Sequence, residues 1–304
     1  MEAHIPVLYD EIITALQPDA SGQYVDGTLG AGGHAAGILQ ASAPAGELLG
    51  LDLDPQALEI ARQHLAPFGG RAHLVQASYT QMTTQAQALG WSKVDGIVLD
   101  LGVSSMQIDT PARGFSFLED GPLDMRFDPQ SERSAADLVN TLEENELADI
   151  LFRYGEERQS RKVARLITQN RPLTSTHQLA GLFLKTFGHR ERIHPATRTF
   201  QALRIAVNGE LDSIEQVLPL AAALLRRGGR LAVISFHSLE DRLVKEYFRR
   251  ESRDCICPPR QPICTCRHQA SLRELNRKPL EASESETHTN SRARSAKLRV
   301  VEKL

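Results

Sequence analysis

A cluster of glycines is the first feature whose residue types and spacing suit chemistry. A short extended run ends at Asp26, and within seven residues come Gly27, Gly30, Gly32 and Gly33. Glycine allows positive φ angles and lets a ligand approach where a Cβ would block it. Because helix-compatible residues 35–40 follow, the order of strand, glycine turn and helix predicts a nucleotide-binding α/β unit. An ordinary glycine-rich loop is the alternative for this stretch alone.

Asp52 is the second candidate for a role in ligand binding. It lies at the carboxyl end of an expected strand, residues 47–54, and 20 positions (52 − 32) after Gly32. An acidic residue at about this distance holds the ribose hydroxyls of a bound nucleoside. Gly30-x-Gly32-x-x-Ala35 also fits the dinucleotide pattern G-x-G-x-x-G/A. NAD and S-adenosylmethionine therefore both remain candidate ligands at this point.

The elements that must position these residues alternate between strands and helices. Further strands are expected at 72–77, 94–100 and 230–236. A helix at 9–16 is expected before the first strand, and helices at 55–65 and 80–89 are expected between later strands. This alternation predicts an α/β fold with a doubly wound parallel sheet, which binds ligands at the carboxyl ends of its strands. Gly30, Asp52, Tyr79 and Asp100 are expected at that edge. An aromatic ring at Tyr79 suits stacking on an adenine, and a core tyrosine is the alternative.

The regular alternation breaks after the fourth strand. Residues 106–130 are rich in proline and glycine and have no clear period, which predicts a long loop. Helical patterns follow at 134–140, 143–154, 157–170 and 177–187. We therefore expect a helical insertion at 106–202, interrupting a nucleotide-binding domain of residues 1–105 and 203–304. Residues 195–227 predict long helical structure that returns to the sheet.

Local signals in the last part of the chain give three smaller expectations. Ser238 is expected to cap a helix that ends at Arg250, with Asp241 completing a capping box. Residues 281–289 are polar and low in complexity, so they are expected to be mobile. Residues 295–302 predict a closing strand.

The charge is distributed unevenly along the chain. Residues 1–150 carry 6 Lys and Arg against 22 Asp and Glu, a net −16, and the remainder carries 29 against 16, a net +13. This split favours an acidic body with a basic surface for a polyanion such as nucleic acid, and a solvated surface without a partner is the alternative. The expected helix at 157–170 adds a set of basic residues: Arg158, Arg161, Lys162 and Arg165.

The four cysteines lie together as Cys255-x-Cys257 and Cys264-x-Cys266. Two such pairs supply four thiolates, enough for a tetrahedral zinc ion, although the spacing is tighter than the usual C-x-x-C. No apolar run approaches the ~20 residues of a membrane span. The N-terminus lacks a basic leader and an apolar signal core, so we expect a cytoplasmic protein in which a disulfide is disfavoured. Zinc and free thiols both remain open.

Seven motifs of the sequence recur, in the same order, in a known family. They are His4-Ile5-Pro6-Val7-Leu8, Val25-Asp26-Gly27-Thr28-x-Gly30-x-Gly32-Gly33-His34, Asp100-Leu101-Gly102-Val103-Ser104-Ser105, Asp124-Met125-Arg126, Arg198-x-Phe200-Gln201-Ala202-Leu203-Arg204, Ser235-Phe236-His237-Ser238-Leu239-Glu240-Asp241-Arg242 and Asn290-x-Arg292-x-Arg294-Ser295-x-Lys297-Leu298-Arg299. The chain thus resembles, nearly from end to end, the bacterial 16S rRNA cytosine-N4 methyltransferases called RsmH or MraW.

The resemblance implies a class I S-adenosylmethionine-dependent methyltransferase fold with an inserted helical, rRNA-recognising domain. The implied substrate is a cytidine of 16S rRNA in the decoding centre of the small ribosomal subunit. Whether the protein forms a homodimer stays open. The resemblance implies cofactor contacts from the glycine loop, the ribose-binding carboxylate, an aromatic beside the adenine, and two residues on the methionine side. In these implied contacts the glycine loop contributes Gly32, Gly33 and His34, and Asp52 is the ribose-binding carboxylate. Tyr79 is the aromatic beside the adenine, and Asp100 and Gln107 lie on the methionine side. The cysteine cluster is not part of the family's common pattern.

Two residues are candidates for catalysis. Asp100 ends the fourth strand, where its carboxylate or the backbone carbonyls after it would accept hydrogen bonds from a cytosine N4 amine. Many amino-methyltransferases have an Asp/Asn-Pro-Pro-aromatic motif there, and this chain has Asp100-Leu101-Gly102-Val103 instead. His237 follows the fifth strand and either contacts the base or is a structural histidine. A nicotinamide oxidoreductase and a non-catalytic rRNA-binding assembly factor are the competing functions; the first would need a second nucleotide-binding half.

Overall fold

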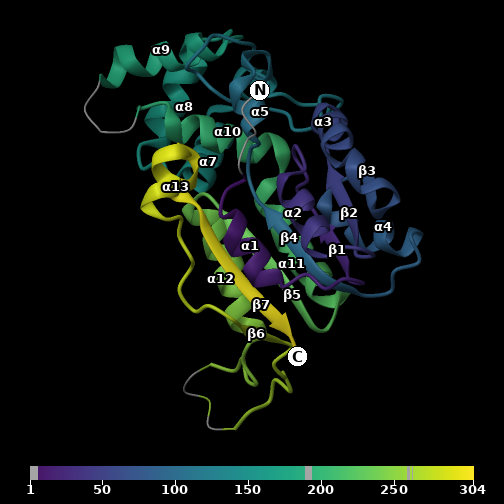
Figure 1. Ribbon diagram of the computed structural model, residues 1–304. Coiled ribbons are helices and arrows are strands. Elements are labelled where there is room, and N and C mark those ends of the chain that lie inside the picture. The colour runs from purple at the N-terminus through teal and green to yellow at the C-terminus, as the bar shows by residue number, and fades with distance from the viewer. Residues whose placement is uncertain (1–5, 189–193, 259–260, 262) are drawn as a thin grey trace. The chain divides into compact units, whose positions relative to one another are not determined.

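The computed structural model describes residues 6–188, 194–258, 261 and 263–304. His4 and Ile5 of the first motif lie outside the described residues. The chain forms two compact units, Met1–Gly102 with Leu211–Leu304, and Val103–Glu210 (Figure 1). The first unit is discontinuous in sequence, and the second is inserted into it.

The first unit is built on a seven-stranded sheet in the order β3-β2-β1-β4-β5-β7-β6. The strands are β1 Gln23–Asp26, β2 Glu47–Asp52, β3 Ala72–Gln76, β4 Val94–Asp100, β5 Leu225–Ser235, β6 Leu272–Glu274 and β7 Lys297–Lys303. Strands β1 to β5 pair in parallel, whereas β7 runs antiparallel to both of its neighbours. The predicted doubly wound sheet is confirmed, and the predicted closing strand is β7. The short strand β6 was not predicted, because three residues carry too little pattern.

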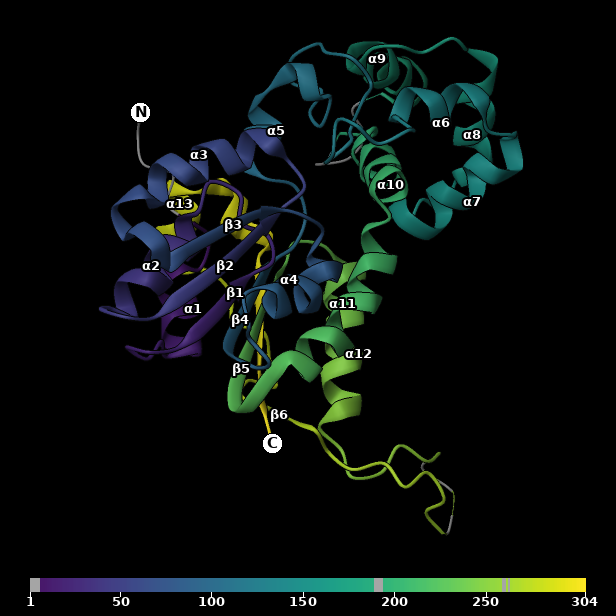
Figure 2. The same ribbon diagram turned by 90° about the vertical axis from the view of Figure 1, so that its right-hand side faces the viewer.

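Helices cover both faces of this sheet because successive strand residues point to opposite sides. In β1, Tyr24 belongs to one core cluster and Val25 to the other. Helices α1 Tyr9–Leu16, α2 Gly33–Ala41 and α3 Pro55–Leu65 pack on the Tyr24 side, whereas α4 Met82–Ala88, α11 Glu210–Leu224 and α12 Ser238–Glu251 pack on the Val25 side (Figure 2). A strand that is buried on both faces has a continuous apolar run in its sequence, and these runs made the strand positions predictable.

Side-chain caps mark the starts of α3 and α12. The side chain of Asp54 caps α3 as predicted, accepting a hydrogen bond from the Gln56 N–H (3.0 Å), and Pro55 takes the first helical position. Helix α12 starts one residue earlier than predicted, because His237, not Ser238, is its N-cap and Glu240 completes the capping box. A neutral histidine ring has an acceptor nitrogen, so it replaces the hydroxyl on which the prediction rested.

Two predictions for the rest of this unit are wrong. Residues expected to be mobile form helix α13 Glu284–Thr289, and the Glu286 carboxylate accepts a hydrogen bond from the N–H of Leu8 (2.7 Å). Leu8 and Glu286 are 278 positions apart in the chain. Their contact thus helps to order a segment whose composition alone predicts mobility. The long helical structure ends at Leu224, and β5 begins at Leu225 instead of Arg230.

The second unit is helical and has its own core. Its helices are α5 Ser105–Asp109, α6 Ala135–Thr141, α7 Glu144–Gly155, α8 Ser160–Gln169, α9 Thr176–Phe187 and α10 Thr197–Asn208. Phe183, Phe200 and Leu203 are among the buried residues that these helices share. The boundary expected between residues 202 and 203 falls inside α10. The apolar periodicity of a helix does not show where one domain ends and the next begins. Among the described residues no helix is both long and apolar enough to cross a membrane.

Candidate functional site

The glycine loop connects β1 to α2 at the carboxyl end of the sheet. Gly30 and Gly32 have φ angles of +51° and +81°, a region that glycine adopts at little cost, and Gly32 is the N-cap of α2. The Gly32 N–H donates to the carbonyl of Leu29 (2.8 Å), which closes the turn. A Cβ added at Gly30 would meet only the Thr28 carbonyl, at 4.0 Å. The loop therefore leaves room for a ligand beside Gly30.

Asp52 ends β2 and is bonded directly to this loop. One carboxylate oxygen accepts the N–H of Gly30 (2.8 Å), and the other accepts the N–H of Asp54 (2.8 Å). Burial raises the pKa of Asp52 to about 6 in spite of these bonds. Each carboxylate oxygen keeps lone-pair capacity for a further donor, such as a sugar hydroxyl. Asp52 thus braces the glycine loop and retains acceptor capacity for a ligand.

Two more carboxyl groups lie near the loop: the buried Asp26 at the end of β1 and the partly exposed Asp100 at the end of β4. Burial raises the pKa of Asp26 to about 7. It raises the pKa of Asp100 well above its usual range, and the negative charges of Asp26 and Glu240 add to the effect. The Oδ1 atom of Asp100 is buried and has no hydrogen-bond partner among the described residues. An unpartnered buried oxygen and elevated pKa values mark a place that a cationic or hydrogen-bond-donating ligand would stabilise.

His34 belongs to the same end of the sheet. Its ring Nε2 lies 2.9 Å from the carbonyl of Val7, and its Nδ1 lies 4.0 Å from Asp100 Oδ2. The preceding residue, Gly33, contacts Pro6 so closely that a Cβ would come within 2.3 Å of the proline ring. The described part of the first motif, Pro6 to Leu8, therefore packs directly against the glycine loop.

Tyr79 also lies at this edge, immediately after β3. Ser78 caps the turn that begins there, and the tyrosine is partly buried against the core of the sheet. A Cβ added at Gly27 would lie 3.0 Å from the Tyr79 Cβ, so the start of the glycine loop and the residues after β3 are adjacent. The stacking of Tyr79 on an adenine stays a prediction.

His237 and Glu240 form a pair at the start of α12. The His237 Nδ1 accepts the N–H of Glu240 (3.4 Å), and its Nε2 lies 3.1 Å from Glu240 Oε1. The other carboxylate oxygen of Glu240 accepts the N–H groups of Phe236 (2.8 Å) and His237 (3.2 Å). The bond to Nδ1 makes His237 the N-cap of α12, while its contact with a base stays a prediction.

Glu240 is the site residue that the sequence reasoning missed. It is completely buried. The sequence contains the capping-box pattern of a cap and a glutamate three residues later. This pattern points to Glu240 only when His237 is taken as the cap.

Gln107 lies in the second unit, on α5. Its side chain accepts a hydrogen bond from the Ser104 N–H (3.0 Å) in a capping box and is buried. Its predicted place beside the methionine side of the cofactor stays a prediction.

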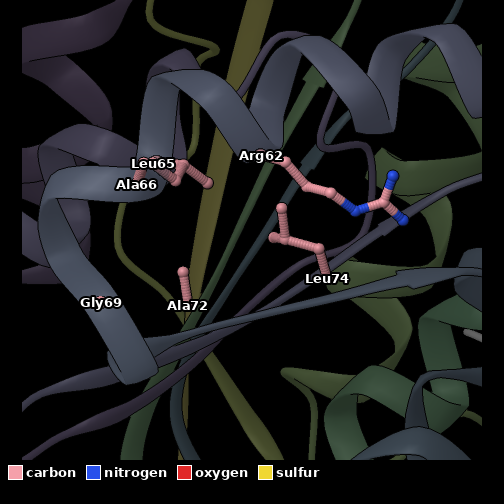
Figure 3. Close-up of a pocket in the computed structure, with 6 residues that line it drawn as sticks. All are labelled: Arg62, Leu65, Ala66, Gly69, Ala72 and Leu74. Carbon is pink, nitrogen blue, oxygen red and sulfur yellow. The ribbon is translucent and has the colours of Figure 1, made fainter.

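A small pocket in the first unit lies elsewhere. It has a volume of about 220 Å³ and lies between α3 and the amino-terminal half of β3 (Figure 3). It is lined by Arg62, Leu65, Ala66, Gly69, Ala72 and Leu74. Because ligands of doubly wound sheets bind at the carboxyl ends of the strands, we do not assign the cofactor to this pocket.

The sheet and its carboxyl edge define a class of protein. Parallel strands in the order β3-β2-β1-β4-β5 followed by an antiparallel β7 form the sheet of class I S-adenosylmethionine-dependent methyltransferases. The glycine loop after β1 and the acidic residue at the end of β2 stand where such a fold holds its nucleoside.

Comparison with known proteins identifies the family. The MraW methylase family matches residues 1–304. A relative from Geobacter sp. (strain M21), named Ribosomal RNA small subunit methyltransferase H, is 52% identical over 99% of this chain and 98% of its own length. A relative of the same name from Thermomicrobium roseum is 49% identical over 99% of this chain and 94% of its own length. The chain belongs to the MraW methylase family.

Proposed function

We propose that this protein is a methyltransferase that uses S-adenosylmethionine to methylate the N4 amine of a cytidine in the decoding centre of 16S rRNA. Its membership of a methylase family, and relatives named as small-subunit rRNA methyltransferases, support the coarser statement of rRNA methylation. The observation that carries the proposal is the convergence of Gly30, Asp52 and Asp100 at the carboxyl ends of β1, β2 and β4. A nicotinamide oxidoreductase does not fit this family.

The residues of the first unit are suited to a cationic nucleoside. Asp52 would accept the ribose hydroxyls, and the open side of Gly30 would face the ligand. When bound, S-adenosylmethionine supplies an activated methyl group on a positively charged sulfonium. The raised pKa values of Asp26 and Asp100 show that both carboxyl groups are costly to ionise, and a neighbouring positive charge offsets this cost. Affinity for the cofactor should therefore rise as the pH rises through about 7.

Asp100 is the residue that we propose assists the transfer. The lone pair of the cytosine N4 amine is delocalised into the ring, so the amine is a poor nucleophile. A hydrogen-bond acceptor for its protons favours the pyramidal nitrogen on which the new bond forms. The buried Asp100 Oδ1, without a partner among the described residues, is such an acceptor. The target base must leave its stack to reach a pocket of this kind.

The second unit is our candidate for rRNA recognition. Val163, Ala164 and Ile167 face its core from α8, which leaves Arg161, Lys162 and Arg165 exposed on the opposite side. Exposed cations on a rigid helix are suited to phosphate contacts, which supply most of the affinity in nucleic-acid binding. A cytoplasmic location follows from the proposed substrate.

Mass mapping tests the proposal. Unmethylated small subunits, and separately free 16S rRNA, would be incubated with the protein and S-adenosylmethionine, and the nucleotides mapped by mass spectrometry. We expect one added methyl group on one cytidine, and a slower transfer for Asp100→Asn even at saturating S-adenosylmethionine. A methyl group on another base or on a ribose would overturn the assignment to N4. Binding of rRNA with no transfer to either substrate would favour a non-catalytic assembly factor.

A further inference from the structure

The four cysteines of the chain come together in the loop between α12 and β6 of the first unit. Sulfur–sulfur distances are 3.5 Å for Cys255–Cys264, 4.0 Å for Cys257–Cys264, 3.6 Å for Cys264–Cys266 and 3.8 Å for Cys255–Cys266. All four sulfur atoms lie within 4.8 Å of one another. Two C-x-C pairs from opposite ends of the loop thus converge on one point.

These distances match the coordination sphere of a single metal ion. Zinc–thiolate bonds are about 2.3 Å long, so the sulfur atoms of a regular tetrahedron around zinc are about 3.8 Å apart. The four distances given above scatter around this value. Four thiolates occupy every tetrahedral position, which is the arrangement of closed, structural zinc sites rather than catalytic ones.

Other roles for the cysteines fit less well. A disulfide needs about 2.05 Å between two sulfur atoms, and all four cysteines are free thiols. An iron–sulfur cluster spreads its thiolates over two or more irons, whereas one centre suffices for sulfur atoms this close together. Four unligated thiols would gain little from converging, since a thiol is a weak hydrogen-bond donor and acceptor.

The loop has little else to hold it together. Ile256 and Ile263, its large apolar side chains among the described residues, are 44% and 74% exposed, so they do not form a core. The backbone is nevertheless arranged around the sulfur atoms: the N–H of Ile256 donates to Cys266 Sγ (3.4 Å). Such a bond stabilises a sulfur that carries negative charge, as a metal-bound thiolate does.

The base of the loop is fixed to the rest of the unit. The Ser271 N–H donates to the carbonyl of Glu251 (2.9 Å), and the His268 Nε2 lies 3.1 Å from the carbonyl of Arg250. His268 is therefore engaged with the end of α12 and is not a fifth ligand. The cluster has a stable platform and a ligand set of four sulfur atoms.

We propose that Cys255, Cys257, Cys264 and Cys266 bind one structural zinc ion that replaces a hydrophobic core for this loop. The site lies outside the proposed cofactor-binding residues and does not depend on the proposed methyl transfer. Removal of the metal is expected to release the loop while leaving the sheet folded, because β5 and β7 are held by their own ladder and core.

Elemental analysis of the full-length protein, purified under reducing conditions from zinc-supplemented medium, tests the proposal. We expect about one zinc per chain, and none in the double variant Cys257→Ser/Cys264→Ser. The matched control His268→Ala changes a neighbouring potential ligand and should retain the metal. Replacement of zinc by Co²⁺ should give the charge-transfer absorption of a tetrathiolate site.

Limited trypsin digestion reports on the loop itself. We expect cleavage after Arg253 or Arg267 to be at least tenfold faster in the double cysteine variant than in the parent protein, with unchanged melting of the remainder. Parent protein that carries no zinc after incubation with excess Zn²⁺, or that carries iron instead, would refute the proposal. Equal digestion rates for metal-bound and metal-free protein would refute the structural role.

Discussion

Asp52 stabilises the fold and is also the residue proposed to bind the ribose of a ligand. Its two oxygens accept N–H groups from Gly30 and Asp54, so the side chain fixes the turn beside which the proposed nucleoside binds. The same bonds leave acceptor capacity on each oxygen. A substitution at this residue is therefore expected to remove the proposed sugar contact and to loosen the glycine loop.

We expect Asp52→Ala to weaken S-adenosylmethionine binding by about 1.5–3 kcal/mol, the usual worth of hydrogen bonds to a charged group. Isothermal titration calorimetry measures the change, and the exposed Asp10→Ala on α1 is the control for the loss of one carboxylate. If the Asp52 variant keeps the parental affinity, Asp52 does not bind the ribose.

At the scale of the element, α8 has an apolar face and a basic face. Its apolar side packs into the core of the second unit, whereas its basic side makes only surface contacts with other residues that the structure describes. The exposed Arg165 lies 3.3 Å from the partly exposed Glu144, and Lys162 lies over the ring of Phe187 at 5.0 Å. Surface pairs of this kind contribute little stability, so a phosphate would compete for these cations at small cost.

Replacing Arg161, Lys162 and Arg165 with alanine should weaken binding to the small subunit. Each lost phosphate contact should lower the slope of log K against log salt by about 0.7–0.9, because fewer counterions are released. Affinity for S-adenosylmethionine should be unchanged, since none of its proposed ligands lies on α8. Filter binding at several salt concentrations measures the affinity for the small subunit and the slope of log K against log salt.

The control for α8 is Arg62→Ala/Lys93→Ala, which removes exposed cations from the glycine-loop half of the chain. It should bind rRNA as the parent does. Melting temperatures must match among the variants before affinities are compared. An α8 variant with parental affinity and slope would show that this face is merely solvated.

At the scale of the whole molecule, the buried acids make stability depend on pH. Burial raises the pKa of Asp26 to about 7 from 3.8, and Asp52 and Asp100 shift in the same direction. Between these values the folded chain binds more protons than the unfolded chain, so the free energy of unfolding falls as the pH rises from about 4 to 7. Asp241, whose pKa Arg299 holds below its usual value against the effect of burial, acts only at lower pH.

Asp26→Asn should reduce this fall, raising the free energy of unfolding near pH 8 by up to about 4 kcal/mol relative to the parent. The amide oxygen still accepts the Thr28 N–H that Asp26 binds at 3.1 Å. Urea denaturation of ligand-free protein between pH 5 and 8 is the measurement, and the exposed Asp10→Asn is the control. A variant with the parental dependence on pH would assign the effect to other groups.

The sequence determined the elements whose signals are local. Apolar runs predicted the sheet from β1 to β4, Asp54 and Pro55 predicted the start of α3, and the glycines with Asp52 predicted a nucleotide-binding edge. Signals of this kind survive because backbone conformation, caps and apolar runs depend on neighbouring residues. The motifs also carried the family, which the comparisons confirmed.

Only the tertiary structure decided what depends on residues distant along the chain. Glu286 of the polar segment that forms α13 bonds to Leu8, and the three residues of β6 pair with β7. The burial of Asp26 and Asp100, which shifts their pKa values, depends on the packing of the sheet. Burial is a property of all the atoms around a group, and no local pattern of residues encodes it.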